Sequence, residues 1–430
     1  MRTKQPGTLT GWAAALTSPG VRRTGGSGLD TFVERTASVA TWANIDSRAR
    51  ALVLACTAHV LHDGYTDLLY VILPLWQREF GLTLAAVGLL RSLYTGAMAT
   101  FQIPSAIAAE RFGATRMLAI GTAFAAGCYL VAAGKATTYE TLALALFAGG
   151  LGSSVQHPVS SNLVARAFSG AASRVALGTY NFSGDIGKIA LPAAAAAMLV
   201  VLPWHSVLWI VGGIGLCVAV VIAALGPPAS SESKPKITET QNAAPMFTIG
   251  FSSLLGIGAI DSAVRMGFLT FLPFVLTHRG ATIATIGFAL SLVFAGGAAG
   301  KFVCGYLGSR IGVLATVCLT EALTAVAIVG LLPLSLPFAL ALLPFLGIAL
   351  NGTSSVLYGS VPEVVAKERR QRAFGVFYTA GVGAGAISPV ASGAFSDAFG
   401  IPLLMTVLAG LALVTIPLAA VLSPRLRAAD

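Results

Sequence analysis

The chain has 430 residues, of which 56% are hydrophobic and only 10% are charged, and its formal net charge is +10. A soluble domain carries about a quarter charged residues, so this chain has too few polar side chains to cover a soluble core. Apolar stretches of about 20 residues, which cross a ~30 Å hydrocarbon layer as helices, recur along the sequence. The period-2 alternation of a membrane β-barrel is not seen. The composition therefore predicts an all-α membrane protein.

The order of polar and apolar segments predicts two six-helix halves. Residues 1–48 are polar and are expected to form a cytoplasmic tail. Residues 226–246 are expected to be a cytoplasmic linker between an N-terminal half, 49–225, and a C-terminal half, 247–424, with a second cytoplasmic tail at 425–430. The twelve predicted spans are 50–75, 84–107, 115–134, 140–166, 174–200, 204–225, 247–276, 282–307, 313–333, 336–361, 373–396 and 401–423.

Basic residues are distributed unevenly among the loops of this map. With the N-terminus inside, 20 of the 27 Lys and Arg residues fall in cytoplasmic segments and 3 fall in outer loops. Cytoplasmic loops of membrane proteins carry an excess of Lys and Arg. We therefore expect a multi-pass protein of the inner (plasma) membrane with both termini in the cytoplasm. The net charge then reflects topology, and no nucleic-acid partner is expected.

The two halves are related by an internal repeat. Pro74 and Pro273 are 199 residues apart, and so are Arg111 and Arg310. A fixed offset that joins such residues is the signature of repeated structure. Because each half has an even number of spans, both halves begin on the same side of the membrane. The repeat is therefore parallel, with its axis along the membrane normal.

This arrangement resembles the major facilitator superfamily of transporters. Residues 106–113 (AIAAERFG) are similar to the family's loop motif G-x-x-x-D-R-x-G, and residues 305–312 (GYLGSRIG) are similar to its second copy. Ala106 stands in place of the first glycine, and Ser309 in place of the acid of the second copy. In the family this loop braces two helices and controls the conformational switch. The resemblance assigns that role to Glu110, Arg111, Gly113, Arg310 and Gly312.

A narrower resemblance is to the fosmidomycin-resistance-like branch of drug exporters. It rests on residues 59–65 (HVLHDGY), 152–158 (GSSVQHP) and 271–273 (FLP), together with Pro74 and Arg265. The resemblance implies a proton-coupled antiporter that exports a small organic compound by alternating access. We expect a monomer in the lipid bilayer that uses the proton gradient as its energy source and needs no cofactor.

Ionisable side chains inside the spans are the candidate functional residues. Such a side chain at the bilayer centre costs about 2.5–3.5 kcal/mol for Asp, Lys or Arg, so it requires a partner or a role. The candidates are His59, His62, Asp63, Asp67, Arg91, His157, Asp185, Lys188, Asp261, Arg265, Lys301 and Glu321.

The first span holds the densest group of these residues. His59 and Asp63 are four residues apart and share a helix face, and Asp67 lies one turn further along. His62 is three residues from His59, and His157 of the fourth span is expected to face the first span. Imidazoles titrate near neutral pH, so one hypothesis is that these five residues bind the coupling proton. The alternative is a structural hydrogen-bond cluster, and no metal site is predicted because spacing fixes no pair of strong ligands.

Two further pairs have short spacings. Asp185 and Lys188 are three residues apart, and Asp261 and Arg265 are four apart, so each pair can neutralise itself on its own helix. The alternative is exchange of partners between helices and binding of an anionic substrate group. His62 corresponds to Asp261 at the 199-residue offset, which places charged groups at equivalent points of both halves.

Three other charged residues have less support. Arg91, in the outer third of the second span, either snorkels to the membrane surface or joins the substrate-binding set. That set is Arg265, Asp261, Asp185, Lys188 and Arg91. Lys301, near the cytoplasmic end of its span, and Glu321, isolated in sequence, are expected to be structural.

Other functions stay open at this stage. Uptake of an organic anion and transport of a metal or metal chelate compete with export. His59 and Asp63 also match the His-x-x-x-Asp spacing of some acyltransferases. A two-half repeat has no reason to exist in such an enzyme, so we expect a transporter of a small molecule and not an enzyme.

Overall fold

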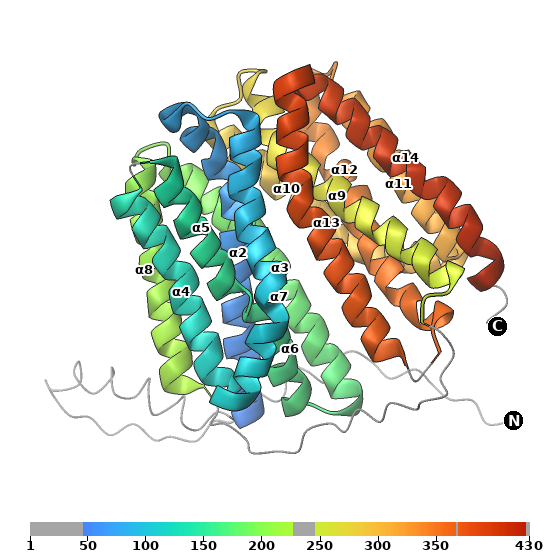
Figure 1. The fold of residues 1–430 in the computed structure, drawn as a ribbon, viewed down its shortest axis with the longest axis horizontal. Coiled ribbons are helices and arrows are strands. Elements are labelled where there is room, and N and C mark those ends of the chain that lie inside the picture. The colour runs from blue at the N-terminus through green and yellow to red at the C-terminus, as the bar shows by residue number, and fades with distance from the viewer. Residues whose placement is uncertain (1–45, 137, 227–245, 367–368, 427–430) are drawn as a thin grey trace, which may run out of the picture. The chain divides into compact units, whose positions relative to one another are not determined.

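The computed structural model describes residues 46–136, 138–226, 246–366 and 369–426. Most of the predicted N-terminal tail, nearly all of the central linker and residues 427–430 lie outside the described residues. The described residues form helices joined by short turns (Figure 1). The helices are α2 Ser47–Phe80, α3 Leu84–Phe112, α4 Ala114–Lys135, α5 Tyr139–Ser153, α6 Gln156–Ala167, α7 Gly170–Met198, α8 Trp204–Leu225, α9 Ile249–Thr277, α10 Ile283–Ile311, α11 Val313–Leu331, α12 Leu336–Val364, α13 Arg370–Phe399 and α14 Ile401–Leu426.

The twelve predicted spans correspond to these helices, with α5 and α6 as two pieces of one span. Most observed bounds lie within a few residues of the predicted ones, and α8 starts and ends at the predicted residues. Among the described residues, nine helices are long and apolar enough to cross a membrane by length and composition: α3, α4 and α8 to α14. The remaining helices, α2, α5, α6 and α7, include the carriers of most of the charged candidates in the N-terminal half.

The repeat predicted from the sequence recurs in the local geometry. The turn before α3 contains Gly81 with φ 61°, and the turn before α10 contains Gly280 with φ 79°. A left-handed backbone of this kind favours glycine, because a Cβ would clash there. Two residues later, the hydroxyls of Thr83 and Thr282 each accept a hydrogen bond from the third residue of the following helix. The same turn and the same cap therefore start the second helix of each half.

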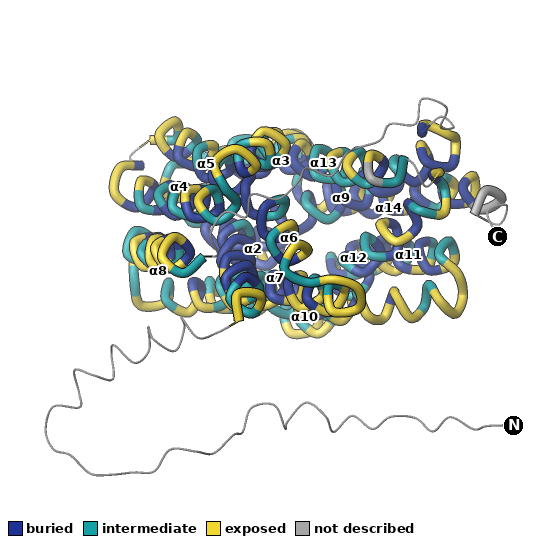
Figure 2. Tube along the Cα trace, turned by 90° about the horizontal axis from the view of Figure 1, so that it is seen from below, coloured by how far each residue is buried: buried dark blue, intermediate teal, exposed yellow. Residues whose placement is uncertain are grey.

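The helices form two groups that meet along two seams. Within the N-terminal group, α2 packs on α7 and α4 packs on α8; within the C-terminal group, α10 packs on α12 and α9 on α14. The groups meet where α3 lies beside α13 and α7 lies beside α10, as the end-on view shows (Figure 2). This is the twelve-helix, two-half architecture that the sequence predicts.

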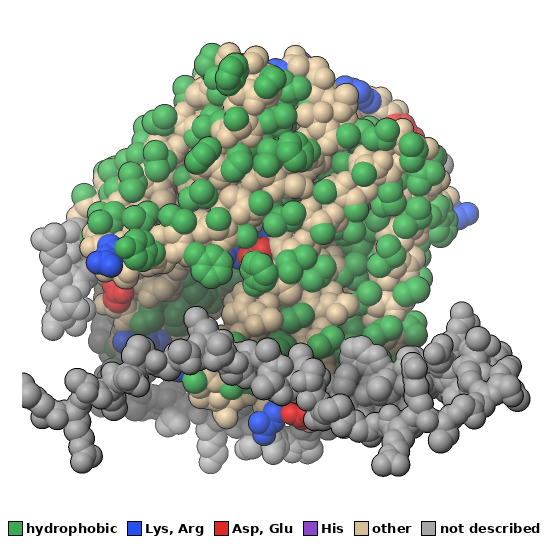
Figure 3. Space-filling model, turned by 180° about the vertical axis from the view of Figure 1, so that it is seen from behind, with side chains coloured by type: hydrophobic (Ala, Val, Ile, Leu, Met, Phe, Trp, Pro, Cys, Tyr) green, Lys and Arg blue, Asp and Glu red, His purple; other side chains and the backbone are tan. Residues whose placement is uncertain are grey.

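Much of the outer surface is apolar. Large hydrophobic side chains are exposed on many helices, among them Ile103 on α3, Ile120 on α4, and Phe288 and Phe302 on α10. Figure 3 shows hydrophobic side chains across most of one face, with charged side chains mainly around its margins and one charged group near its centre. Exposed apolar area of this extent is the surface that lipid tails cover.

The halves are packed together at one end and separate at the other. We call the end that contains Gly81 the Gly81 end, and the opposite end, at the α3–α4 turn, the Gly113 end. The largest buried hydrophobic cluster lies toward the Gly81 end and joins both halves, with Leu69 of α2 and Phe268 of α9 among its members. Toward the Gly113 end the buried clusters belong to one half each. In Figure 1, α3 and α13 diverge in this direction.

Close backbone contacts hold the halves together at the Gly81 end. A Cβ on Gly393 of α13 would lie 2.6 Å from the carbonyl carbon of Leu84 of α3, so only glycine fits. The backbone N–H groups of Leu84 and Ala85 donate to the two carboxylate oxygens of Asp397 at 2.8 Å each. A side chain of the C-terminal half thus caps a helix of the N-terminal half.

Candidate functional site

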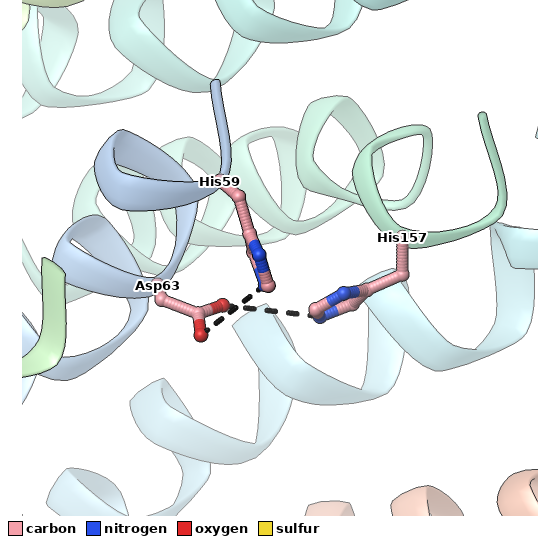
Figure 4. Close-up of side chains that lie close together, drawn as sticks. All are labelled: His59, Asp63 and His157. Atoms are coloured by element: carbon pink, nitrogen blue, oxygen red, sulfur yellow. Dashed lines mark ion pairs between the residues drawn. The ribbon is translucent and has the colours of Figure 1, made fainter. Parts of the chain in front are cut away.

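Four basic side chains surround the carboxylate of Asp63 on α2. The Nε2 atom of His59 lies 3.4 Å from Oδ2, and the Nε2 atoms of His62 and His157 lie 3.9 Å from Oδ1. The ammonium of Lys188 on α7 lies 3.4 Å from Oδ2. Asp63 is only 7% exposed. Figure 4 shows His59 and His157 pointing at the carboxylate from different helices.

A break in the fourth span places His157. The sequence predicts one helix over 140–166, but α5 ends at Ser153 and α6 begins at Gln156. Pro158 explains the break, because its ring clashes with the carbonyl of residue i−4, which is Ser154, and it has no N–H to donate. His157 therefore lies in the first turn of a separate short helix and reaches toward α2. The expectation that it faces the first span holds.

Glycines bring α7 close to α2 at the same level. A Cβ on Gly184 of α7 would lie 2.5 Å from Oδ2 of Asp63 and 2.7 Å from Nε2 of His59. A Cβ on Gly187 would lie 2.8 Å from the carbonyl carbon of Val60. Any larger residue at these positions would displace the imidazole–carboxylate pair or separate the two helices.

His59 lies between two oxygen acceptors. Its Nδ1 is 2.8 Å from the backbone carbonyl oxygen of Tyr180, and its ring stacks on the Tyr180 ring at a centroid distance of 4.2 Å. A carbonyl oxygen only accepts, so Nδ1 carries a hydrogen and donates. Nε2 then faces the Asp63 carboxylate, which also only accepts when ionised. This arrangement is satisfied when one further proton sits between His59 and Asp63.

Arg91 belongs to a second buried group in the same half. Its guanidinium donates to the Tyr70 hydroxyl at 2.9 Å and lies 3.8 Å from Oδ1 of Asp67. Arg91 is fully buried, so of its two alternatives the one in which it snorkels to the membrane surface is wrong. A buried charge is costly unless it has partners. Asp67 and Tyr70 on α2 supply them, so the Arg91 guanidinium can stay in the interior.

Asp185 and Lys188 do not pair with each other. Lys188 turns to Asp63, whereas both carboxylate oxygens of Asp185 accept from the Lys301 ammonium, at 2.6 and 2.7 Å. Lys301 is on α10, so this ion pair joins the two halves. The expectation that Lys301 is structural missed its role as the partner of Asp185, since sequence spacing says nothing about contacts between halves.

In the C-terminal half, Asp261 and Arg265 pair on their own helix at 3.6 Å. Glu321 of α11 lies within hydrogen-bonding reach of the Asp261 carboxyl. Both acids are almost fully buried. Glu321 is therefore not isolated: its partner sits 60 positions earlier in the sequence, which no local pattern could show.

The predicted switch-loop residues lie at exposed helix ends. Gly113 and Gly312 take φ values of 95° and 84° and separate consecutive helices in the two halves. The Arg111 guanidinium lies 5.5 Å from the Phe112 ring centre, and that of Arg310 lies 5.3 Å from the Tyr306 ring centre. The acid of the first copy, Glu110, is also exposed. The structure places these residues at the Gly113 end, on the turns that link the second and third helices.

The group His59, Asp63 and His157 offers three ligand atoms within 4.8 Å of one another, close enough for one metal ion. The Lys188 ammonium lies 3.4 Å from the same carboxylate, and its positive charge would repel a divalent cation at that point.

The structure consists of two packed six-helix halves with an ion pair between them. The sequence profile of the Major Facilitator Superfamily matches residues 55–260 and 254–430. The chain belongs to this family.

A curated relative has a more specific name. The chain is 30% identical over 187 residues to the fosmidomycin resistance protein of Escherichia coli strain K12, a match that covers 42% of this chain and 45% of the relative. The chain thus spans about half the length of that relative.

Two solved structures share the fold. Both are described as a bacterial homolog to the human lysosomal transporter Spinster in an inward-facing conformation. The unoccupied form has a TM-score of 0.68 at 19% identity, covering 89% of this chain and 96% of that one. The occupied form has a TM-score of 0.69 at 18% identity, covering 88% and 95%.

Proposed function

We propose that this protein is a proton-coupled exporter of a small organic compound that works by alternating access in the inner (plasma) membrane. The observation that carries the proposal is the buried Asp63 carboxylate, which faces Nε2 of His59 at 3.4 Å. Because Nδ1 of His59 donates to the Tyr180 carbonyl, Nε2 without a further proton is an acceptor, as the carboxylate is. A proton between these two groups satisfies both, and its loss leaves two acceptors facing each other. The cluster is therefore built to gain and lose a proton.

Lys188 gives the proton a mechanical consequence. Its ammonium lies 3.4 Å from Asp63, and the charges of Asp67 and Asp185 also act on it. A proton that neutralises Asp63 removes the attraction between Asp63 and Lys188. Lys188 is then free to pair with another anion, either a carboxylate on a neighbouring helix or an anionic group of the substrate. Proton binding and substrate binding in this way compete for the same charges.

The partly exposed cations favour an anionic or polar substrate. The side chains of Lys188 and Arg265 are 34% and 21% exposed, whereas Arg91 is fully buried. The first two are accessible to a ligand, and a guanidinium can bind an anionic group with two hydrogen bonds. We therefore place Lys188 and Arg265 in the substrate path, with Asp63 and Asp261 as their carboxylate partners. Asp185, paired with Lys301, belongs to the same path because its charge acts on Lys188. We assign Arg91 to holding Asp67.

Export rather than uptake is favoured by the relative's name, which denotes resistance to fosmidomycin. Resistance is what removal of a toxic compound from the cell would produce. In the orientation predicted from the basic residues, the Gly81 end faces outward and the Gly113 end faces the cytoplasm. The separation of the halves at the Gly113 end then corresponds to a state open to the inside, ready to collect substrate.

Reconstituted liposomes with an imposed pH gradient test this proposal. A panel of fosmidomycin, small drugs and organic acids is assayed for movement against the direction of proton flow. Accumulation driven by the gradient, and abolished by a protonophore, supports proton-coupled export. Movement of every transported compound in the same direction as the protons would instead establish uptake by symport, and transport indifferent to the gradient would contradict proton coupling.

A further inference from the structure

The C-terminal half contains a second pair of acids, remote from the Asp63 cluster. Asp261 on α9 and Glu321 on α11 are 4% and 2% exposed, and their carboxyl groups lie within hydrogen-bonding reach. Ionised carboxylates only accept hydrogen bonds. A hydrogen bond between two carboxyl groups therefore requires a proton on one of them.

The surroundings of the pair supply one positive charge for two acids. The Arg265 guanidinium lies 3.6 Å from Oδ2 of Asp261. Cys318, one turn from Glu321 on α11, is the other titratable group near it. Among the described residues, no charged side chain of α12, α13 or α14 acts on the pair. With both acids ionised, the group would carry a net negative charge in the interior, which is costly.

Neighbouring hydroxyl groups do not satisfy Glu321 either. Its Oε1 is buried and has no hydrogen-bond partner among the described residues. On the same helix, the Thr320 hydroxyl is directed to the carbonyls of Thr316 and Val317. The Thr353 hydroxyl of α12 donates to the Thr320 oxygen. The Thr324 hydroxyl, one turn further along α11, is also buried and makes no hydrogen bond to Glu321 among the described residues. Asp261 is therefore the carboxyl partner of Glu321.

The internal repeat relates this acid pair to two residues of the N-terminal half. Subtracting 199 from each number gives His62 and Thr122, which line the same small pocket between α2 and α4 in the N-terminal half. The C-terminal half has two acids at the equivalent points. Arg265 also acts on Asp67 and Lys188 of the N-terminal half. Its charge is therefore close enough to act both on the acid pair and on the charged groups of the opposite half.

We propose that Asp261 and Glu321 form a second proton-binding site, with Arg265 as its counter-charge. With one proton bound, the pair and Arg265 are together neutral. Loss of that proton adds a negative charge that draws Arg265 toward the pair. Proton binding releases Arg265 toward the N-terminal half and toward an anionic substrate group. The proton occupancy of the pair stands by itself, whereas its use in transport rests on the proposed proton coupling.

Infrared spectroscopy of the purified full-length protein in lipid tests the occupancy directly. The wild type should show a protonated-carboxyl C=O band at neutral pH that disappears on alkaline titration. Glu321→Gln should remove this band, because the remaining Asp261 is neutralised by Arg265. Glu321→Asp keeps a titratable group and should restore a band, which separates loss of the proton from loss of the fold. Glu140→Gln, the same change at an exposed position, is the matched control and should leave the band intact.

A transport measurement then tests the use of the proton. In liposomes with a gradient of one pH unit, Glu321→Gln should reduce the accumulation of the transported compound about tenfold, the factor contributed by one proton. An unchanged infrared band in Glu321→Gln would overturn the second site. If the wild type shows no gradient-driven transport while the band behaves as expected, the proposed coupling fails and the proton site stands.

Discussion

Replacing Asp63 with Asn gives the sharpest test of the coupling proposal. Asn preserves the size of the side chain but binds no proton and carries no charge. In the structure one proton fits between His59 and Asp63, so the substitution removes one proton from the transport cycle. A proton that crosses a gradient of one pH unit releases about 1.36 kcal/mol, equivalent to a tenfold concentration ratio. Asp63→Asn should therefore lower the steady-state accumulation about tenfold for each pH unit.

The assay uses liposomes that contain wild-type or variant protein, with the internal and external pH set independently and the compound measured at steady state. Asp46→Asn is the matched control. Asp46 is an exposed cap at the start of α2, and Asn caps a helix as well as Asp does, so its accumulation ratio should equal that of the wild type. An Asp63→Asn protein that is folded and accumulates the compound as the wild type does would show that this cluster is structural.

Three further predictions concern packing, the contact between halves and topology. Gly184→Ala should impair gradient-driven transport in the same liposome assay, because its Cβ would lie 2.5 Å from a carboxylate oxygen of the proton cluster, whereas Gly178→Ala on the same helix meets nothing within 4 Å and should be neutral. Asp397→Ala removes the two hydrogen bonds from Leu84 and Ala85 across the halves but leaves the Thr83 cap of α3 in place, at a cost of about 1 kcal/mol. Spin-label distances between the outer ends of α3 and α13 should then show about fivefold more of the form open at the Gly81 end; an unchanged distribution would show that Asp397 does not hold this end closed. A Cys at position 236 should resist a membrane-impermeant thiol reagent added outside intact cells while Lys135→Cys reacts, and strong labelling at 236 would contradict the predicted orientation.

The fold was largely predictable because a bilayer restricts what a chain can do. A helix is the simplest way to satisfy every backbone group in lipid, so apolar stretches of about 20 residues locate the spans. The short turns also depend on local sequence. Gly81 and Thr83 recur as Gly280 and Thr282, with the same left-handed backbone and the same helix caps. The break between α5 and α6 follows locally from Pro158, although the spans were predicted with one continuous helix over 140–166.

The candidate residues were identified because a charged residue inside a predicted span is costly, and the sequence shows which residues these are. The partners of these residues could not be identified, because sequence spacing relates only residues on the same helix. The short spacing of Asp185 and Lys188 favoured a pair on α7, but the glycines of α7 press it against α2 and bring Lys188 to Asp63.

The sequence by itself determined the helical class, the two-half repeat and which residues bear charge inside the spans, since each depends on composition or on local periodicity. Tertiary structure alone decided which charges meet. The packing of α7 beside α10 gives Asp185 its partner Lys301. The packing of the C-terminal half brings Asp261 of α9 to Glu321 of α11 and so forms the acid pair. The physical reason is that electrostatic energy falls with distance in space, and helix packing sets those distances between residues that are far apart in the sequence, 60 positions for Asp261 and Glu321 and 116 for Asp185 and Lys301.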